Sequence, residues 1–331
     1  MINLPVIDEA IKNKRVLVRG DIDVPVDDYA RLEAIKPTID YLRDHGNVVI
    51  LCGHLGRPIG DYEERFSVKR VAHWFANKEV NPSWIEGRFR GFEVDRNFIV
   101  LENLRFYPEE EKNDSGFARE IADLAEVYVN EAFATSERAH ASIVGVPKFL
   151  PHFAGFQLAK EVEMLSKITN NPRRPVLAII GGAKIETKAP VISAMEKLAD
   201  KIIVGGKIVT EVFHYSLDRE KVFALPLTED FKDIFPQAIS DMEADFLLAD
   251  TIIWNGPFGA IEEDQWQAGT KKVAELILKN KKAYKVVGGG DTVDFLRKLG
   301  ITDQFDWVST GGGSMINFLS GGKLPGIEAL Q

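Results

Sequence analysis

The chain has 331 residues, 45% of them hydrophobic, and a formal net charge of −9. This length suggests two domains, and the hydrophobic content is typical of a globular protein that buries real cores. The acidic balance disfavours a nucleic-acid binder, because such proteins need a locally basic surface.

Several further classes are disfavoured by what the sequence lacks. It shows no basic-plus-apolar leader and no run of about 18 apolar residues, so we expect neither a secretory signal nor a membrane partner. The single cysteine, Cys52, lies in an apolar run and is expected to be an inert core residue. One cysteine allows no disulfide within the chain, which fits a reducing cytoplasm. The six histidines are scattered without the spacing of zinc ligands.

The first half of the chain alternates short β-branched runs with longer helical stretches. Strands are predicted at Arg15–Gly20, Val48–Cys52, Phe98–Leu101 and residues 127–130, and a helix at residues 117–124. The strand runs are apolar throughout, which is typical of strands buried on both faces. This βαβα order predicts a parallel sheet with helices on both faces.

Charged side chains follow these predicted strands. Several arginines near strand ends predict a pocket for a small polyanion, because a guanidinium group binds carboxylate and phosphate bidentately. A single arginine would more often be a solvated surface residue. The residues assigned to this group are Asp21, Asp23, Arg31, His54, Arg57, Arg105, Arg138 and His140.

A helix is predicted between the two halves, at residues 154–169. Leu158, Val162 and Leu165 form one apolar stripe at helical spacing, and Asn170-Asn171-Pro172 ends the pattern. No glycine- or serine-rich linker occurs here. We therefore expect the helix to join two lobes as a stiff hinge.

The second half repeats the alternation, and most of its predicted strands end in glycine. The glycine turns read I-I-G-G-A-K, I-V-G-G-K, W-N-G-P-F-G, V-V-G-G-G-D and S-T-G-G-G-S. Open α/β sheets bind ligands at the carboxyl ends of their strands, and bare amides there cradle phosphate. The strands are predicted at Val176–Ile180, Lys201–Val204, 222–225, 251–254, 284–287 and Trp307–Ser309.

One of these turns adds an acid. Asp291 comes directly after three glycines, and a carboxylate beside phosphate requires a divalent cation between them. Any single glycine turn could serve tight packing alone. Five such turns in one half of the chain favour a nucleotide or phosphate site.

The motifs, taken together and in order, are similar to those of the phosphoglycerate kinase family. They cover nearly the whole chain, which makes the resemblance far more specific than any one motif. The stretches that carry it are V-R-G-D-I-D-V-P at 18–25, G-H-L-G-R-P at 53–58, L-E-N-L-R-F at 101–106, E-E-K-N-D at 110–114, Y-V-N-E-A-F at 128–133, R-A-H-A-S at 138–142, G-G-A-K at 181–184, W-N-G-P at 254–257, G-G-G-D-T at 288–292, S-T-G-G-G at 309–313 and L-P-G-I-E-A-L at 324–330.

The resemblance implies an α/β protein with two Rossmann-like lobes, each a parallel sheet with helices on both faces. It implies a 3-phosphoglycerate-binding lobe at residues 1–153, a hinge helix at 154–170 and a nucleotide-binding lobe at 171–317. The tail, at about 318–331, would return to the first lobe. The implied reaction moves the acyl phosphate of 1,3-bisphosphoglycerate to Mg-ADP when the lobes close, giving 3-phosphoglycerate and ATP. The family resemblance also implies a cytoplasmic monomer.

The resemblance also assigns residues. Arg31, Lys184 and Lys188 would be catalytic, and Asp291 would hold Mg²⁺. The glycerate contacts would be Asp21, Asp23, Arg31, His54, Arg57, Arg105 and Arg138. The nucleotide contacts would be Gly181, Gly182, Ala183, Lys184, Lys188, Gly205, Gly206, Asn255, Pro257, Glu262, Gly288, Gly289, Gly290, Asp291 and Thr292.

The chain departs from the family pattern in several places. It is short, and most of the loss lies between residues 206 and 254, where residues 231–236 stand for the segment that lines the purine pocket. Asp23 replaces an asparagine and cannot donate a hydrogen bond as a carboxylate. We therefore expect it to face a substrate hydroxyl or to be neutralised by an arginine. The remaining departures are Glu131, Ala134, Glu137, Lys207 and Phe235.

Rival functions lack their motifs. A nicotinamide dehydrogenase should show G-x-G-x-x-G with an acid further on, and a Walker-type ATPase should show G-x-x-x-x-G-K-[ST]; we find neither. The remaining alternative is a shortened, non-catalytic paralog that binds phosphoglycerate or nucleotide. Retention of Arg31, Lys184, Lys188 and Asp291 favours the kinase, because a binder has less need of cations suited to phosphoryl transfer.

Overall fold

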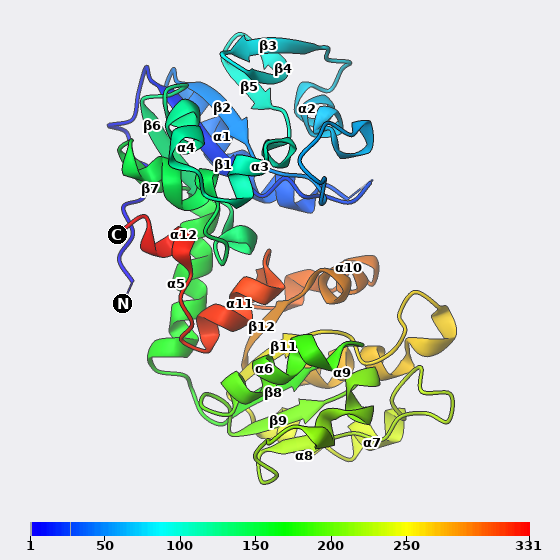
Figure 1. Cartoon of the computed structure of the whole chain (residues 1–331). Coiled ribbons are helices and arrows are strands. Elements are labelled where there is room, and N and C mark those ends of the chain that lie inside the picture. Colours follow the sequence, from blue (N-terminus) through cyan, green and yellow to red (C-terminus); the bar gives the residue numbers. More distant parts are fainter. Residues whose placement is uncertain (1, 27) are drawn as a thin grey trace. The chain divides into compact units, whose positions relative to one another are not determined.

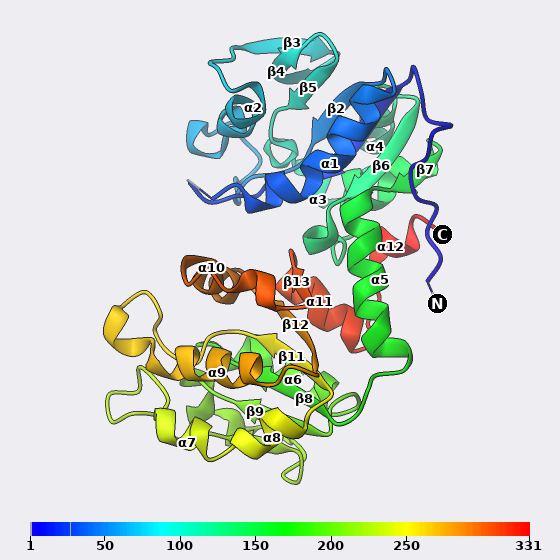
Figure 2. The same cartoon turned by 180° about the vertical axis from the view of Figure 1, so that it is seen from behind.

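The computed structural model describes residues 2–26 and 28–331, and this part of the chain divides into two compact units (Figures 1 and 2). The N-terminal unit contains residues 2–163 and 323–331, and the C-terminal unit contains residues 164–322. The chain passes from the first unit to the second inside helix α5 (Phe156–Asn170). None of the described helices is both long enough and apolar enough to span a membrane.

In the described part of the N-terminal unit, seven strands form one mixed sheet in the order β3-β4-β5-β2-β1-β6-β7. The strands from β5 to β7 in this order are parallel, which confirms the predicted parallel core. Their bounds are β1 Arg15–Gly20, β2 Val48–Cys52, β5 Phe98–Leu101, β6 Val127–Glu131 and β7 His152–Ala154.

Strands β3 (Pro82–Glu86) and β4 (Phe89–Asp95) were not predicted, and they make this edge of the sheet antiparallel. Both alternate between more exposed and more buried residues, as antiparallel strands with one solvated face do. Their apolar positions are few and interrupted by polar residues, so they lack the continuous apolar run that marks the central strands. The first sheet is therefore mixed rather than purely parallel.

Helices flank this sheet and complete its core. In the N-terminal unit they are α1 (Ala30–Asp44), α2 (Lys69–Ala76), α3 (Pro108–Glu111), α4 (Ser115–Ala122) and α12 (Pro325–Glu328). Helix α4 begins two residues before its predicted start, because the Asp114 carboxylate accepts a hydrogen bond from Phe117 N (2.9 Å) and caps the helix. Helix α12 joins β6 and the loop after it: Asn130 Nδ2 donates to Gly326 O (3.1 Å) and Gly326 N donates to Ser136 O (2.8 Å).

The described part of the C-terminal unit has a six-stranded parallel sheet in the order β10-β9-β8-β11-β12-β13. Each of these strands was predicted, to within one residue at either end. The bounds are β8 Val176–Ile180, β9 Lys201–Val204, β10 Val222–Ala224, β11 Thr251–Asn255, β12 Tyr284–Gly288 and β13 Trp307–Ser309.

Helices cover both faces of the second sheet, as the predicted α/β fold requires. Helices α6 and α11 pack together on one face, and α8 and α9 pack together on the other (Figures 1 and 2). Their bounds, with the remaining helices of this unit, are α6 Ile185–Met195, α7 Pro236–Ser240, α8 Glu243–Leu248, α9 Ala268–Lys279, α10 Gly290–Lys298 and α11 Gly312–Leu319.

A buried carboxylate fixes the start of α5. Glu131, the last residue of β6, is 1% exposed and accepts hydrogen bonds from Gln157 N (3.1 Å), Leu158 N (2.8 Å) and the hydroxyl of Thr38 in α1. These bonds satisfy amides that a helix leaves free in its first turn. Gly155 is required here, because a Cβ atom at that position would lie 2.2 Å from Glu131 Cδ. Burial raises the pKa of Glu131 to about 7, although its hydrogen bonds oppose the shift.

This raised pKa predicts a pH dependence of stability. Between about pH 4.5 and 7 the folded protein holds a proton on Glu131 that the unfolded chain has lost, so the free energy of unfolding falls as the pH rises. Between pH 5 and 8 we expect the free energy of unfolding of wild type, measured with urea, to fall by about 3 kcal/mol through this group. In Glu131→Gln this fall should be absent. Glu126→Gln, at an exposed acid just before β6, is the control and should keep the wild-type loss. An unchanged pH profile in Glu131→Gln would contradict the assignment.

Candidate functional site

The first group of predicted residues gathers at one end of the N-terminal sheet. The parallel strands run in the order β5-β2-β1-β6-β7, so the chain order reverses between β1 and β6. Parallel α/β sheets bind ligands at such a reversal, beyond the carboxyl ends of the strands. The residues that follow these strand ends are Asp21 and Asp23 after β1, His54 and Arg57 after β2, Arg105 after β5 and Arg138 after β6.

Asp21 is the most deeply buried acid of this group. It is 2% exposed, and its Oδ1 lies 3.3 Å from Arg31 Nη1, which also donates to the Asp23 carbonyl (2.9 Å). Burial raises the pKa of Asp21, while the nearby Arg31 and Arg19 oppose the shift. Asp21 Oδ2 is buried and has no hydrogen-bond partner in the described chain. A buried acceptor without a donor costs free energy, so this oxygen is suited to accept a hydrogen bond from a hydroxyl group of a ligand.

Asp23 links two loops of this group. Its Oδ1 accepts a hydrogen bond from Gly56 N (2.9 Å), and its Oδ2 lies 3.8 Å from His54 Nε2. The carboxylate thus joins the loop after β1 to the loop after β2. Gly56 lies in the left-handed region at φ +64°, and a Cβ atom there would meet the Phe66 ring at 2.4 Å.

Three of the predicted arginines line a cavity of about 770 Å³. Arg105 is fixed within it, because Nη1 donates to Gly56 O (2.6 Å) and Nε lies 3.0 Å from Glu111 Oε1. Burial lowers the pKa of His140 to about 4, with further lowering by the arginines, so His140 is neutral near pH 7. Asp21, Asp23, Arg31 and His54 do not line this cavity. Its walls are Arg57, Pro58, Ile59, Gly60, Arg105, Tyr107, Pro108, Glu111, Lys112, Arg138 and His140.

The second group of predicted residues lies at the reversal point of the C-terminal sheet, between β8 and β11. Gly181 N donates to Asn255 O (2.9 Å), so the two loops touch through their backbones. A Cβ atom on Gly181 would lie 2.2 Å from Pro257 O, and one on Gly256, at φ +96°, would lie 2.1 Å from Gly181 O. Only glycine fits at either position. The predicted Gly206 also approaches this place, next to the backbone of Gly182.

Asn255 and Thr292 connect three of the glycine turns. Asn255 Nδ2 donates to Gly288 O (3.1 Å), at the end of β12, and to Gly312 O (3.3 Å), at the start of α11. Thr292 Oγ1 accepts from Gly256 N (3.1 Å). Gly289 caps α10 at φ +107°, and Gly290 begins the helix. The backbone amides of this turn therefore begin a helix, a place where phosphate binds readily.

Lys188 is a half-buried cation of this site. Its Nζ donates to Asn255 Oδ1 (2.5 Å), which leaves two of its three donors for a ligand. Burial lowers the pKa of Lys188, and the charge of Asp291 opposes the shift. Lys184 caps the start of α6 and is exposed, as is Asp291 in the first turn of α10.

The described residues contain no group of three metal-binding side chains. A lone carboxylate such as Asp291 nevertheless fits Mg²⁺, because proteins usually bind that ion through one or two carboxylates together with substrate phosphates.

The other predicted nucleotide residues differ in their surroundings. Gly205 is buried after β9, and a Cβ atom there would meet the Phe258 ring at 2.5 Å. Ala183 is exposed beside Lys184, and Pro257 lies at the glycine contact after β11. Glu262 is exposed, and within the described chain no hydrogen bond or ion pair joins it to the other predicted residues.

The shortened segment is anchored by an acid whose role the sequence did not reveal. Asp233 is 2% exposed and accepts hydrogen bonds from Ile234 N (2.8 Å) and Gly269 N (2.9 Å), at the start of α9. On either side of it, Phe231 and Phe235 are 59% and 44% exposed. The sequence signal was an acid between apolar residues in a loop, which cannot distinguish a buried anchor from a surface residue.

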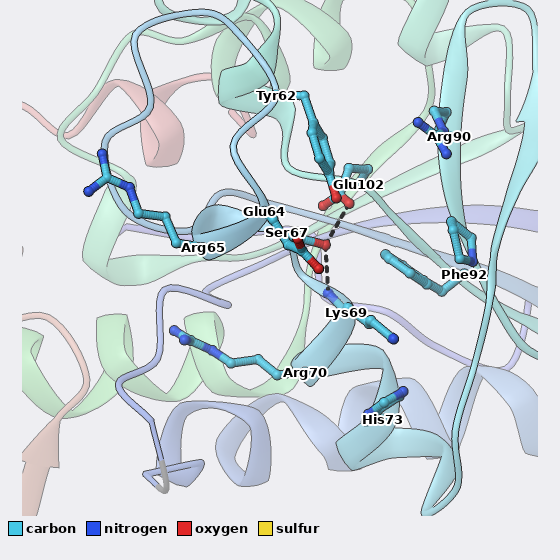
Figure 3. A pocket seen from close by; sticks show the side chains of 11 residues that line it. Tyr62, Glu64, Arg65, Ser67, Lys69, Arg70, His73, Arg90, Phe92 and Glu102 are labelled. Carbon is cyan, nitrogen blue, oxygen red and sulfur yellow. Dashed lines mark hydrogen bonds between the residues drawn. The ribbon is translucent and has the colours of Figure 1, made fainter.

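A second cavity, of about 380 Å³, lies between α2, β4 and the loop before α2 and contains none of the predicted residues (Figure 3). Three of its charged side chains already have partners of opposite charge: Arg65 with Glu63, and Lys69 and His73 with Glu79. Its buried acid, Glu102, accepts hydrogen bonds from Ser67, Val68 and Asn103. This cavity lies apart from the predicted residues, which gather at the strand-order reversals.

An α/β protein with an arginine-lined pocket in one unit and phosphate-type turns in the other has the parts of a phosphotransferase. A model of the family "Phosphoglycerate kinase" matches residues 6–218 and 211–322. The chain therefore belongs to the phosphoglycerate kinase family and is a kinase, as the resemblance predicted. The two matched stretches meet at residues 211–218, within the segment identified as shortened.

Individual relatives agree over nearly the full length. The phosphoglycerate kinase of Dictyoglomus turgidum is 36% identical over 385 residues, covering 98% of this chain and 97% of the relative. That of Finegoldia magna is 37% identical over 386 residues, covering 97% of each. The solved structure of the Coxiella burnetii enzyme is 31% identical with a TM-score of 0.79, and that of Pyrococcus horikoshii OT3 is 26% identical with a TM-score of 0.81; each comparison covers 97% of this chain and 96% of the other. The chain has 331 residues, fewer than the 385 and 386 positions of the alignments with the Dictyoglomus turgidum and Finegoldia magna enzymes.

The bond between Asp23 and Gly56 can be tested without a ligand. Asp23→Ala removes the acceptor for Gly56 N, so exchange of this amide hydrogen should speed up, and the N-terminal unit should lose about 1 kcal/mol of stability. Asp23→Asn retains an acceptor oxygen and should keep the slow exchange. Equal exchange rates in Asp23→Ala and wild type, measured by NMR, would show that the carboxylate does not hold this loop.

Proposed function

We propose that the chain catalyses the reversible phosphoryl transfer from 1,3-bisphosphoglycerate to Mg-ADP, giving 3-phosphoglycerate and ATP, in glycolysis and gluconeogenesis. The observation that carries the proposal is the set of groups at the reversal point of the C-terminal sheet. There Lys188 donates a hydrogen bond to Asn255 among glycine turns, and Gly181 and Gly256 approach each other too closely for any side chain. A protein that needed this place only for packing would have no use for a half-buried lysine with two donors left over.

The N-terminal unit, with a lobe boundary near residue 153, would bind the glycerate. Asp21 Oδ2 lacks a donor and is suited to the substrate hydroxyl. Arg57, Arg105 and Arg138 line the cavity and suit the substrate's anionic groups, because guanidinium groups bind phosphate and carboxylate bidentately. Arg31, at the edge of the same group, would act on the transferred phosphoryl group.

The nucleotide would bind to the lobe at residues 171–317. Amides of the turns at Gly181–Gly182 and Gly288–Gly290, with Lys184 and Lys188, would hold its phosphates. Mg²⁺ would arrive with the nucleotide as part of the substrate, and the Asp291 carboxylate would hold it. When bound, the ion neutralises charge on the phosphate oxygens.

Phosphoryl transfer needs alignment and charge neutralisation more than covalent help. Arg31, Lys184 and Lys188 would supply the positive charge. Helix α5 would act as the hinge for closure of the lobes, which would exclude the water that otherwise hydrolyses an acyl phosphate. We further propose that the enzyme is a cytoplasmic monomer, in keeping with its glycolytic family and its single buried cysteine.

A coupled assay for ATP formation from 1,3-bisphosphoglycerate and Mg-ADP, on the purified chain, tests the proposal. We expect turnover, and we expect the double variant Lys184→Ala with Lys188→Ala to abolish it. Binding of both substrates without any turnover would instead identify the chain as the non-catalytic paralog.

Asp291→Asn should weaken Mg-ADP binding and depress turnover at least a hundredfold, because the variant loses the one carboxylate of the turn that faces the phosphates. Affinity for 3-phosphoglycerate should stay within about twofold of wild type, since that ligand binds the other lobe. Asp294→Asn, one turn later in α10, is the matched control and should retain turnover. Steady-state kinetics across a Mg²⁺ titration checks this. Wild-type Mg²⁺ dependence in Asp291→Asn would overturn the assignment.

The shortened wall predicts weak selectivity for the nucleotide base. Phe231 and Phe235 are exposed and offer no hydrogen bond, and a stacking ring tolerates either purine. To distinguish adenine from guanine, a pocket requires polar groups that cannot pair with the hydrogen-bonding edge of the wrong base. We expect affinities for Mg-ADP and Mg-GDP to differ by less than about tenfold, or about 1.4 kcal/mol, by calorimetry. A preference for ADP of a hundredfold or more would mean that the short segment still builds a specific pocket.

A further inference from the structure

A buried arginine of the N-terminal unit takes no part in the site as described so far. Arg19, in β1, is 0% exposed, although the sequence places it inside an otherwise apolar strand. Its Nε donates to Ser142 Oγ (2.9 Å), its Nη1 donates to the Gly20 carbonyl, and its Nη2 lies 3.0 Å from His54 Nδ1. Each of the three guanidinium nitrogens is thus in use, and one of them reaches a predicted substrate residue.

A second buried charge holds this arginine in position. Ser142 Oγ donates to Glu110 Oε1 (2.5 Å), and Ser142 N donates to Glu110 Oε2 (2.9 Å). A hydroxyl has one donor and two acceptor sites, so Ser142 can accept from Arg19 while it donates to Glu110. Glu110 is fully buried. The relay from Glu110 through Ser142 therefore fixes the guanidinium plane against His54.

The contact between Arg19 and His54 determines the form of the imidazole ring. A guanidinium group has only donors and stays protonated in proteins. His54 Nδ1 must therefore be the acceptor, and an acceptor nitrogen carries no proton. The ring proton then lies on Nε2, and His54 is neutral.

The surroundings of His54 act in the same direction. The ring is 2% exposed, and burial lowers its pKa well below the ordinary value, with further lowering by Arg19, Arg105, Arg138 and His140. Among the described residues the acid that faces it is Asp23, whose Oδ2 lies 3.8 Å from Nε2. That distance is too long for a hydrogen bond, and in the described chain Nε2 has no hydrogen-bond partner.

We propose that Arg19 is a positioning residue for the substrate site: it holds His54 as the neutral tautomer with its proton on Nε2, so that His54 presents a hydrogen-bond donor to the anionic substrate at every working pH. The identity of the ligand rests on the proposed function, whereas the state of the ring does not. An ordinary histidine would change its charge near pH 6.5, and the affinity of the site would change with it. Three arginines already supply positive charge. A neutral His54 with a fixed donor therefore adds a directional hydrogen bond to the ligand without adding a charge that changes with pH.

The tautomer can be observed directly. In protein labelled with ¹⁵N-histidine, two-bond proton–nitrogen correlation spectra distinguish a protonated Nε2 from a protonated Nδ1, and His54→Gln assigns the signals among the six histidines. We expect the His54 signals to show Nε2–H and no titration between pH 5.5 and 8. A proton on Nδ1, or a titration midpoint near 6.5, would overturn the proposal.

Three variants separate positioning from general damage. Arg19→Lys keeps a donor-only group and should keep the tautomer. Ser142→Ala removes the anchor of the guanidinium but leaves the His54 bond, so the tautomer should persist. Arg19→Met removes the donor that fixes the proton on Nε2, and we expect signals of the Nδ1–H tautomer to appear. If Arg19→Met does not fold, the wild-type, Arg19→Lys and Ser142→Ala spectra still decide the question, because a titrating His54 in any of them contradicts the proposal.

The functional half is tested by the affinity for 3-phosphoglycerate, measured by calorimetry at two pH values. At pH 7.5 we expect the dissociation constant of Arg19→Met to be about tenfold that of wild type, the worth of one good hydrogen bond. Arg19→Lys keeps a donor for His54 Nδ1 and should stay within about threefold of wild type at pH 7.5 and at pH 5.5. Equal affinities in Arg19→Met and wild type, or an equal loss in Arg19→Lys, would overturn this half. If wild type fails to bind 3-phosphoglycerate at all, the proposed function fails, while the spectra still decide the tautomer.

Discussion

The structure depends on one constraint of parallel sheets. Where the strand order reverses, the two loops on either side must leave in opposite directions, and a crevice remains at the carboxyl ends of the strands. Both units of this chain have such a reversal, between β1 and β6 in one and between β8 and β11 in the other. The groups that we assign to function lie at these two places, because a crevice at a strand-order reversal leaves side chains and backbone open to a ligand.

The two reversals differ in the chemical groups that lie there. In the C-terminal unit the reversal is built from backbone, and glycine is required because Gly181 and Gly256 approach within distances that exclude any side chain. In the N-terminal unit the side chains are long and charged, and burial controls their state. The arginines remain cations, whereas His54 and His140 are held neutral. Charge at that site is thus carried by groups that do not titrate near neutral pH.

The sequence predicted the central strands well, because an apolar run of fixed length between glycine or charged ends has few other interpretations. It failed for β3 and β4, because their alternating, partly exposed residues form no continuous apolar run and resemble a loop. It also did not reveal the contacts that Asp23 and Arg19 make, for a different reason. The partners of these residues, Gly56 and His54, lie more than 30 positions away. A residue type indicates what a side chain can do, but only the register of β1 against β2 decides which group it meets.

The return of the chain's last residues to the N-terminal unit has a consequence for biosynthesis. Asn130 and Ser136 bond to Gly326, and Ile327 and Leu330 are buried in that unit. A ribosome makes residues 2–163 first, but these contacts form only after all of residues 164–322 have been translated. The unit that is synthesised first is therefore completed last, so its full stability is available only to a chain whose second unit has already emerged.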